Sequence, residues 1–201
     1  MATIGLDDLY YAPITFDTND EEVYGTPVKL AKAISAGITV ELAEAILYAD
    51  NGAAEAIRGF KSGTLSLGVD DIGATTAAAL TGAELDNNGV LVASAENESP
   101  YVAVGFRAKK ANGKYRYFWL YKVKFSIPGT DVQTQGESIA FATPTIEGTI
   151  LQRNKAAGTD RHPWKVEVTE GDAGVTTTTT SGWFSAVYEP DFSTNPNNTQ
   201  I

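Results

Sequence analysis

The clearest pattern of apolar and polar positions lies in two long alternating segments, residues 101–110 and 114–127. Between them stands Asn112-Gly113, and both of these residues tolerate the positive φ that a two-residue β-turn requires. A turn of this kind fixes the register of the two strands, and a slip of one residue would send every side chain to the other face. The pattern therefore predicts a long antiparallel hairpin.

A two-residue turn at Asn112-Gly113 pairs Ala111 with Lys114 and separates two faces. The predicted apolar face pairs Ala108 with Tyr117, Phe106 with Trp119, Val104 with Tyr121 and Val102 with Val123. The predicted mixed and basic face pairs Lys109 with Arg116, Arg107 with Phe118, Gly105 with Leu120, Ala103 with Lys122 and Tyr101 with Lys124. We interpret the first face as buried.

Further alternating segments predict further strands. They are residues 62–69, residues 137–151 around Pro144, and residues 164–168. Residues 28–48 fit two strands around a turn at Gly37, although the Ala and Glu content of residues 40–48 also fits a helix. The five-Thr run at 176–180 fits either strand or loop.

Two short helices are predicted beside the strands. The first covers residues 72–80, with Asp70-Asp71 as its N-terminal cap and Thr81-Gly82 as its end. The second follows from the spacing of Trp183-Phe184 and Val187-Tyr188 before Pro190. Residues 1–27 are polar and turn-rich and predict an N-terminal arm, and residues 193–201 predict a flexible tail. We therefore expect one domain over residues 1–201, mainly β (α+β), with one or two short helices.

Charge and composition narrow the classes of function. The chain has 15 Lys and Arg against 25 Asp and Glu, a formal net charge of -10, which argues against a broad surface for nucleic-acid phosphates. It has no Cys, which excludes disulfides, thiolate metal sites and Cys nucleophiles. The N-terminus lacks a secretory signal pattern, and no apolar run reaches the roughly 18 to 20 residues that span a bilayer. We expect synthesis in the cytoplasm and no membrane insertion.

Candidate catalytic residues are few. His162 is the only histidine and stands in a polar loop, so the triads and zinc sites that need partner residues have no support. Asp70-Asp71 and Glu96-Asn97-Glu98 could supply paired carboxylates, but capping and loop solvation explain them as well. No dinucleotide-binding or Walker motif is present. We expect no enzyme activity, no cofactor and no metal.

Basic residues gather on the predicted hairpin of an acidic protein. Such polarity favours contacts between copies of the chain, including the heterologous contacts that form rings and tubes. The predicted subunit interface includes the hairpin, the arm and the 50–60 loop. Its residues are Lys109, Lys114, Arg116, Lys122, Lys124, Arg58 and Asp50.

Three segments resemble the major tail (tail tube) proteins of long-tailed, non-contractile phages and prophages of Gram-positive bacteria. They are residues 100–107 with 112–123 and 143–148, the opening residues 5–12, and Trp183-Phe184 with residues 187–190. The resemblance implies a β-sandwich or barrel-like tail-tube fold with one or two short flanking helices. It also implies a virion protein that forms stacked hexameric rings. Such a tube surrounds a tape-measure protein, joins tail terminator and distal tail proteins, and later conducts double-stranded DNA without binding it specifically.

Two other functions remain open at this point. Exposed Tyr and Trp side chains could stack on sugars, so a β-sandwich module that binds carbohydrate or a cell surface is the main alternative. A hydrolase using Asp70, Asp71 or Glu96 is the weaker one. Assembly of the purified protein into rings or tubes would favour the tail-tube hypothesis over these two alternatives.

Overall fold

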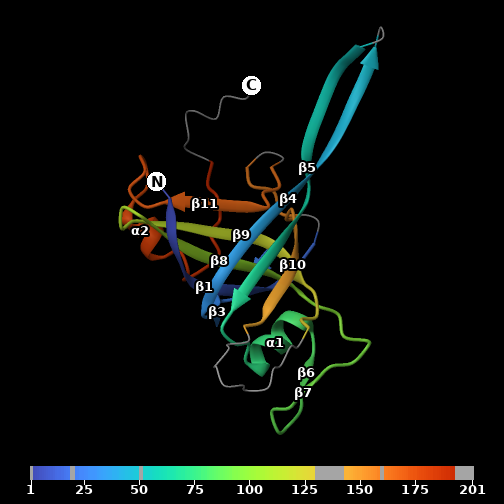
Figure 1. Ribbon diagram of the computed structural model, residues 1–201, viewed down its shortest axis with the longest axis vertical. Coiled ribbons are helices and arrows are strands. Elements are labelled where there is room, and N and C mark those ends of the chain that lie inside the picture. The colour runs from blue at the N-terminus through green and yellow to red at the C-terminus, as the bar shows by residue number, and fades with distance from the viewer. Residues whose placement is uncertain (1, 19–20, 50–51, 130–142, 159–160, 193–201) are drawn as a thin grey trace, which may run out of the picture.

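A computed structural model describes residues 2–18, 21–49, 52–129, 143–158 and 161–192 (Figure 1). The fold is mainly antiparallel β-sheet with two short helices, as predicted. Within the described residues, no helix is long and apolar enough to cross a membrane. The strands are β1 (Thr3–Asp17), β2 (Glu22–Tyr24), β3 (Val28–Ala31), β4 (Ala33–Ala49), β5 (Gly52–Val69), β6 (Glu84–Leu85), β7 (Leu91–Val92), β8 (Tyr101–Lys110), β9 (Tyr115–Phe125), β10 (Thr145–Leu151) and β11 (Lys165–Thr169).

The main sheet curls into a barrel. Its order is β2-β1-β8-β9-β10-β5-β4, and β11 pairs with β9 beside β10. Only Lys32 separates β3 from β4, and β3 pairs with β1 while β4 pairs with β5. This nearly continuous segment therefore joins the two ends of the sheet order.

An apolar core fills the barrel because each strand places alternate side chains inward. Burial of one such side chain contributes about 1.5–3 kcal/mol of transfer free energy. The buried residues include Leu9, Leu30, Leu65, Leu67, Val102, Val104, Leu120, Val123, Ile146 and Ile150. Helix α1 (Ala74–Thr81) adds Leu80 to the same core.

A second cluster covers the outer face of β8 and β9. The C-terminal segment, residues 176–192, contains helix α2 (Thr177–Ser181) and packs Trp183 and Val187 against the strands. The strand side chains beneath are Ala12, Ala103, Tyr117, Trp119 and Tyr121. The hairpin is therefore buried on both faces, whereas the sequence predicted one buried face.

The predicted register of the β8–β9 hairpin is wrong by one residue near its turn. Lys110 N–H donates to Lys114 O at 2.8 Å, so the loop is the three residues 111–113, and Gly113 takes φ +82° at its end. A three-residue loop with a left-handed third residue is a known alternative to the two-residue turn. An irregularity between Val102 and Val104 then restores the predicted pairs of Val102 with Val123 and Tyr101 with Lys124.

The changed register moves side chains between faces. Phe106 pairs with Phe118, and their rings stack at 4.9 Å, while Trp119 lies opposite Gly105. Lys109 pairs with Tyr115 and Arg116 with Ala108, which puts these two cations on opposite faces. The predicted single basic face is therefore incorrect.

The other predictions have mixed outcomes. The predicted strands at 62–69 and 164–168 are confirmed, and that at 137–151 is confirmed for β10. Residues 40–48 are strand, Gly37 lies inside β4, and the second helix is α2 in the Thr run instead of residues 183–188. The first helix begins at Ala74 after Gly73, not after an Asp cap, and ends at Gly82.

The N-terminal segment is another correction. Residues 3–17, expected in an arm, form β1, which pairs with β8, and Leu9 and Ala12 are fully buried. The predicted tail at 193–201 and residues 137–142 lie outside the described residues.

Candidate assembly surfaces

The most prominent surface is the β4–β5 hairpin, which extends well beyond the barrel (Figure 1). The register runs from the pair Ala33 and Val69 in the barrel to the pair Ala49 and Gly52 near the tip. Leu65, Leu67 and Val69 are fully buried, but residues 40–45 and 57–59 are exposed. Among the described residues, the outer part is thus a two-stranded ribbon that no other segment covers at residues 40–45 and 57–59.

Apolar side chains lie on both faces of this ribbon. Leu42 pairs with Phe60 on one face, and Ile57 pairs with Ala45 on the other. Leu42 is 59% exposed and Ile57 69% exposed. A lone two-stranded hairpin is marginally stable in water, so contact of these exposed apolar side chains with a partner would stabilise the ribbon.

One contact links the base of the ribbon to the barrel, and one ion pair links the two strands of the ribbon. The Phe60 ring stacks on Trp164 with centroids 4.7 Å apart and planes 6° apart. Arg58 donates from Nε and one terminal nitrogen to Glu44 Oε1, at 3.0 and 2.8 Å. The sequence predicted a contact region here, and Arg58 lies on the ribbon, whereas Asp50 is outside the described residues.

An open sheet edge accompanies the ribbon. β4 is the last strand of the sheet order, and beyond the barrel its outer edge has no strand partner among the described residues. Unpaired N–H and C=O groups on such an edge can add a strand from another chain. The ribbon therefore offers both backbone and side-chain contacts to a partner.

The basic residues predicted as an interface have different surroundings. Lys122 is buried, Lys124 pairs with Glu98 at 2.7 Å, and Arg116 pairs with Glu167. Lys109 and Lys114 are exposed near the β8–β9 turn. Three of the five cations on the β8–β9 hairpin thus have partners inside the chain. A role of these residues in a subunit interface stays a prediction.

Lys122 belongs to a buried polar network that the sequence did not reveal. Its Nζ lies 2.6 Å from Asp17 Oδ2 and 3.3 Å from Glu22 Oε1. Glu22 is 2% exposed and also accepts from Tyr24 Oη and from the Asn154 N–H, at 3.0 and 2.9 Å. Buried charges need such full pairing, because an unpaired one is strongly destabilising.

A second buried cation ties down the C-terminal segment. Arg153 is 1% exposed, donates to Glu189 at 2.9 Å, and lies over the Tyr121 ring at 4.5 Å. Burial raises the pKa of Tyr121 and, together with the Glu22 charge, that of Tyr24. Asn154 donates to Glu22 and to Asp17, which are 132 and 137 residues away in sequence, so no local pattern signals these contacts.

The candidate catalytic residues do not come together in one site. Most of them have structural roles. Asp70 accepts from the Lys32 N–H at 3.0 Å, and Asp71 accepts from the Ile72 N–H at 2.8 Å. Glu98 pairs with Lys124, and His162 is exposed. In the part of the chain that the structure covers, no group of three His, Asp or Glu side chains could hold a metal ion.

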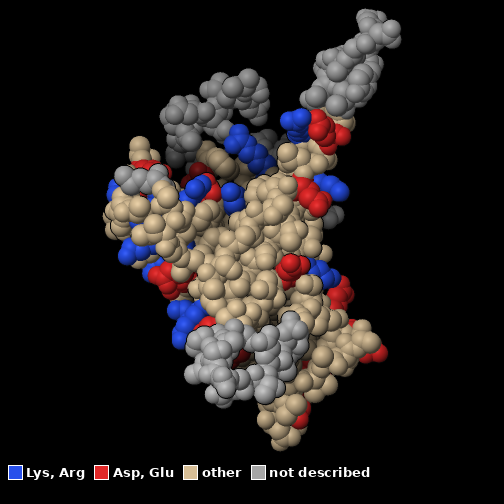
Figure 2. Space-filling view, viewed as in Figure 1, with Lys and Arg blue, Asp and Glu red and all other residues tan. Residues whose placement is uncertain are grey.

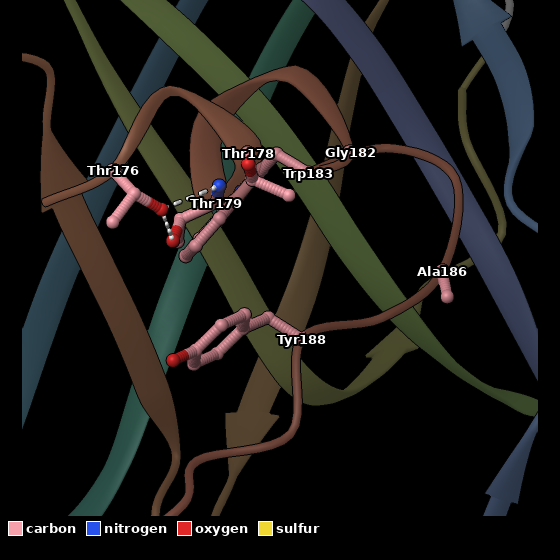
Figure 3. Close-up of a pocket in the computed structure, with 7 residues that line it drawn as sticks. All are labelled: Thr176, Thr178, Thr179, Gly182, Trp183, Ala186 and Tyr188. Atoms are coloured by element: carbon pink, nitrogen blue, oxygen red, sulfur yellow. Dashed lines mark hydrogen bonds between the residues drawn. The ribbon is translucent and has the colours of Figure 1, made fainter.

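A shallow pocket of about 310 Å³ lies beside helix α2 (Figure 3). Its lining includes Thr178, Thr179 and Tyr188, and the Tyr188 ring stacks on Trp183 at 4.9 Å. Thr176 caps the helix by accepting from the Thr179 N–H. Hydroxyl groups beside an aromatic ring suit a sugar, which keeps the carbohydrate alternative open.

Charges of both signs are interspersed over the face in Figure 2. No broad basic area appears on this face, which agrees with the net charge of -10. Such a face does not suit the phosphate backbone of a nucleic acid.

Comparisons with known proteins add one structural similarity. The sequence matches no protein-family model and no curated protein. Among solved structures, a cryo-EM structure of the anti-feeding prophage cap, described as the cap that terminates the AFP tube, is similar to this chain with a TM-score of 0.44. The two are 10% identical, and the match covers 84% of this chain and 93% of that one.

Proposed function

We propose that this chain is a structural subunit of a phage-type tail that self-assembles into a tube. The observation that carries the proposal is the β4–β5 ribbon, which exposes Leu42 on one face and Ile57 on the other. Leaving these side chains in water costs free energy that burial against another chain would recover. The ribbon therefore has the properties of an element that becomes buried in an assembly.

The sequence resemblance to tail-tube proteins supplies the detail of the proposal. On this hypothesis six copies form a ring and rings stack into a tube in the virion tail. The tube surrounds a tape-measure protein, contacts terminator and distal tail proteins, and conducts double-stranded DNA. An acidic subunit suits a conduit that does not hold the DNA phosphates.

Removal of the ribbon tests the proposal. Replacing residues 43–59 with an Asn-Gly turn connects the paired residues Leu42 and Phe60 and leaves the barrel core intact. We expect the variant to fold, judged by near-UV circular dichroism, and to form no rings or tubes by electron microscopy and sedimentation. Wild-type protein under the same conditions should assemble.

Point variants provide a finer comparison. Ile57→Asp should block assembly, whereas Ile127→Asp, at a side chain equally exposed at 68%, serves as the matched control and should assemble normally. Tubes of normal length from the ribbon-deleted protein, or a wild-type protein that stays monomeric at every concentration, would refute the proposal.

The pocket beside α2 favours a second candidate, a module that binds carbohydrate. Tyr188 and the Thr hydroxyls would then contact a sugar. Binding to a glycan panel that is lost in Thr178→Val, from a protein that never assembles, would support this candidate against the tube.

A further inference from the structure

A small exposed hairpin, β6–β7, lies beside helix α1 at one end of the molecule (Figure 1). Leu85 pairs with Leu91, and Glu84 pairs with Val92. Val90, Leu91 and Val92 are 57%, 37% and 47% exposed. This set of apolar side chains has little cover within the described residues.

The connecting turn of this hairpin is held in one conformation. Asp86 accepts from the backbone N–H groups of Asn88 and Val90, both at 2.8 Å. These two bonds lower the pKa of Asp86, and they fix the turn in the absence of a partner. A preformed loop loses little conformational entropy on binding.

The segment that carries the β6–β7 hairpin contains acidic residues and no basic ones. Residues 83–98 include Glu84, Asp86, Glu96 and Glu98 and no Lys or Arg. Of these, Glu98 pairs with Lys124, whereas Glu84 is exposed and has no ion pair among the described residues.

The opposite composition occurs at the turn between β8 and β9. Residues 107–116 include five Lys and Arg and no Asp or Glu. Lys109 and Lys110 make no ion pair within the described part of the chain, unlike Arg107, which pairs with Asp7 and Asp8. On the adjacent strand Ile4, 65% exposed, lies between the partners of these lysines, Thr3 and Gly5.

The two surfaces lie at opposite ends of β8. The acidic segment leads into Tyr101 at the start of the strand, and the basic turn follows Lys110 at its end. Ten extended residues separate the ends by about 30 Å at ~3.3 Å per residue, so the surfaces of one molecule cannot meet each other. The acidic surface of one copy can, however, contact the basic surface of a second copy.

We propose that the β6–β7 hairpin of one copy docks on the β8–β9 turn of another, with Val92 against Ile4 and Glu84, which shares a face of the hairpin with Val92, near Lys109. The contact joins two different surfaces, so it is heterologous and propagates from copy to copy until a ring closes or a filament extends. It rests on the proposed self-assembly and names one of its interfaces. Apolar contact holds the surfaces, and the opposite charges select the orientation.

Cysteine cross-linking tests this contact cleanly because the chain has no Cys of its own. One preparation carries Ile4→Cys and another Val92→Cys, each with its surface otherwise intact. The mixture should form a disulfide-linked dimer on mild oxidation about tenfold faster than either preparation alone, as expected for a heterologous interface. A mixture of Val23→Cys, 48% exposed, with Val92→Cys is the matched control.

Charge exchange adds an independent readout. Lys109→Glu should slow the cross-linking of Ile4→Cys to Val92→Cys by about tenfold at low salt, and Glu84→Lys in the Val92→Cys copy should restore the rate. Both changes lie on exposed side chains and leave the barrel core intact.

The outcomes separate this inference from the proposed function. Tubes visible by electron microscopy, with cross-linking no faster than the Val23→Cys control, would overturn only the docking of β6–β7 on the β8–β9 turn. Absence of both tubes and specific cross-links would overturn the docking and the self-assembly together.

Discussion

At the residue scale, Lys122 shows how a charged side chain can serve the interior of this protein. It is 6% exposed and bridges Asp17 and Glu22, which flank the connection from β1 to β2. The same Glu22 accepts from the backbone N–H of Asn154, after β10. One lysine thus joins three segments that are distant in sequence.

Replacing Lys122 tests this role. Lys122→Met should lower the free energy of unfolding by about 3–5 kcal/mol, because it leaves Glu22 charged and buried without its cation. The measurement is urea unfolding of the unassembled subunit. Lys124→Met removes a cation of the same strand that pairs with the exposed Glu98, and it should change stability little. Equal effects of the two substitutions would contradict the buried network.

At the element scale, the β8–β9 hairpin depends on a close approach between two residues. Gly105 lies opposite Trp119, and a Cβ atom at Gly105 would meet the indole ring at 2.8 Å. Trp119 is fully buried and donates from Nε1 to Trp183 O at 3.0 Å, which links the hairpin to the C-terminal segment. The ring has little room to move away.

Gly105→Ala should therefore destabilise the subunit by about 1–3 kcal/mol through overpacking. Gly59→Ala is the matched control, because no heavy atom lies within 4 Å of a Cβ at that position in β5. Urea unfolding and near-UV circular dichroism of the indole rings measure both. A Gly105→Ala protein as stable as Gly59→Ala would show that the hairpin has a different register.

At the scale of the whole molecule, the buried Tyr121 and the half-buried Tyr24 mark where distant segments meet, because their ring centroids lie 6.2 Å apart. Tyr121 Oη donates to Tyr188 O at 2.8 Å, and Tyr24 Oη donates to Glu22 at 3.0 Å. Burial raises the pKa of both phenols, and for Tyr24 the Glu22 charge raises it further. The folded protein thus keeps both hydroxyls protonated where an unfolded chain would ionise them.

The stability that depends on these two groups is complete below the ordinary tyrosine pKa of about 10 and is lost as the pH rises above it. We expect an ultraviolet titration to show fewer than the nine tyrosines ionising before the protein unfolds. The double variant Tyr24→Phe, Tyr121→Phe should lose stability less steeply above that pH. Ionisation of all nine tyrosines in the folded state with one ordinary pKa would refute the prediction.

The sequence predicted local elements with good accuracy where a short-range pattern decides them. Alternation identified the strands around Leu65, Lys165 and the two halves of the β8–β9 hairpin, and Gly82 ended helix α1 near its predicted position. The Thr run became helix α2 because Thr176 caps it. The sequence prediction for this run was strand or loop, so the helix was missed.

Only the tertiary structure decided which faces are buried and which charges are free. Alternation in β8 and β9 gives the two faces of a hairpin, but residues 176–192 cover the second face from a distant part of the chain. Asp17 and Glu22, 105 and 100 positions away, neutralise Lys122, while Lys109 and Leu42 remain exposed. Burial and ion pairing depend on contacts between distant segments, so the composition and periodicity of one segment determine its local form but not its surroundings.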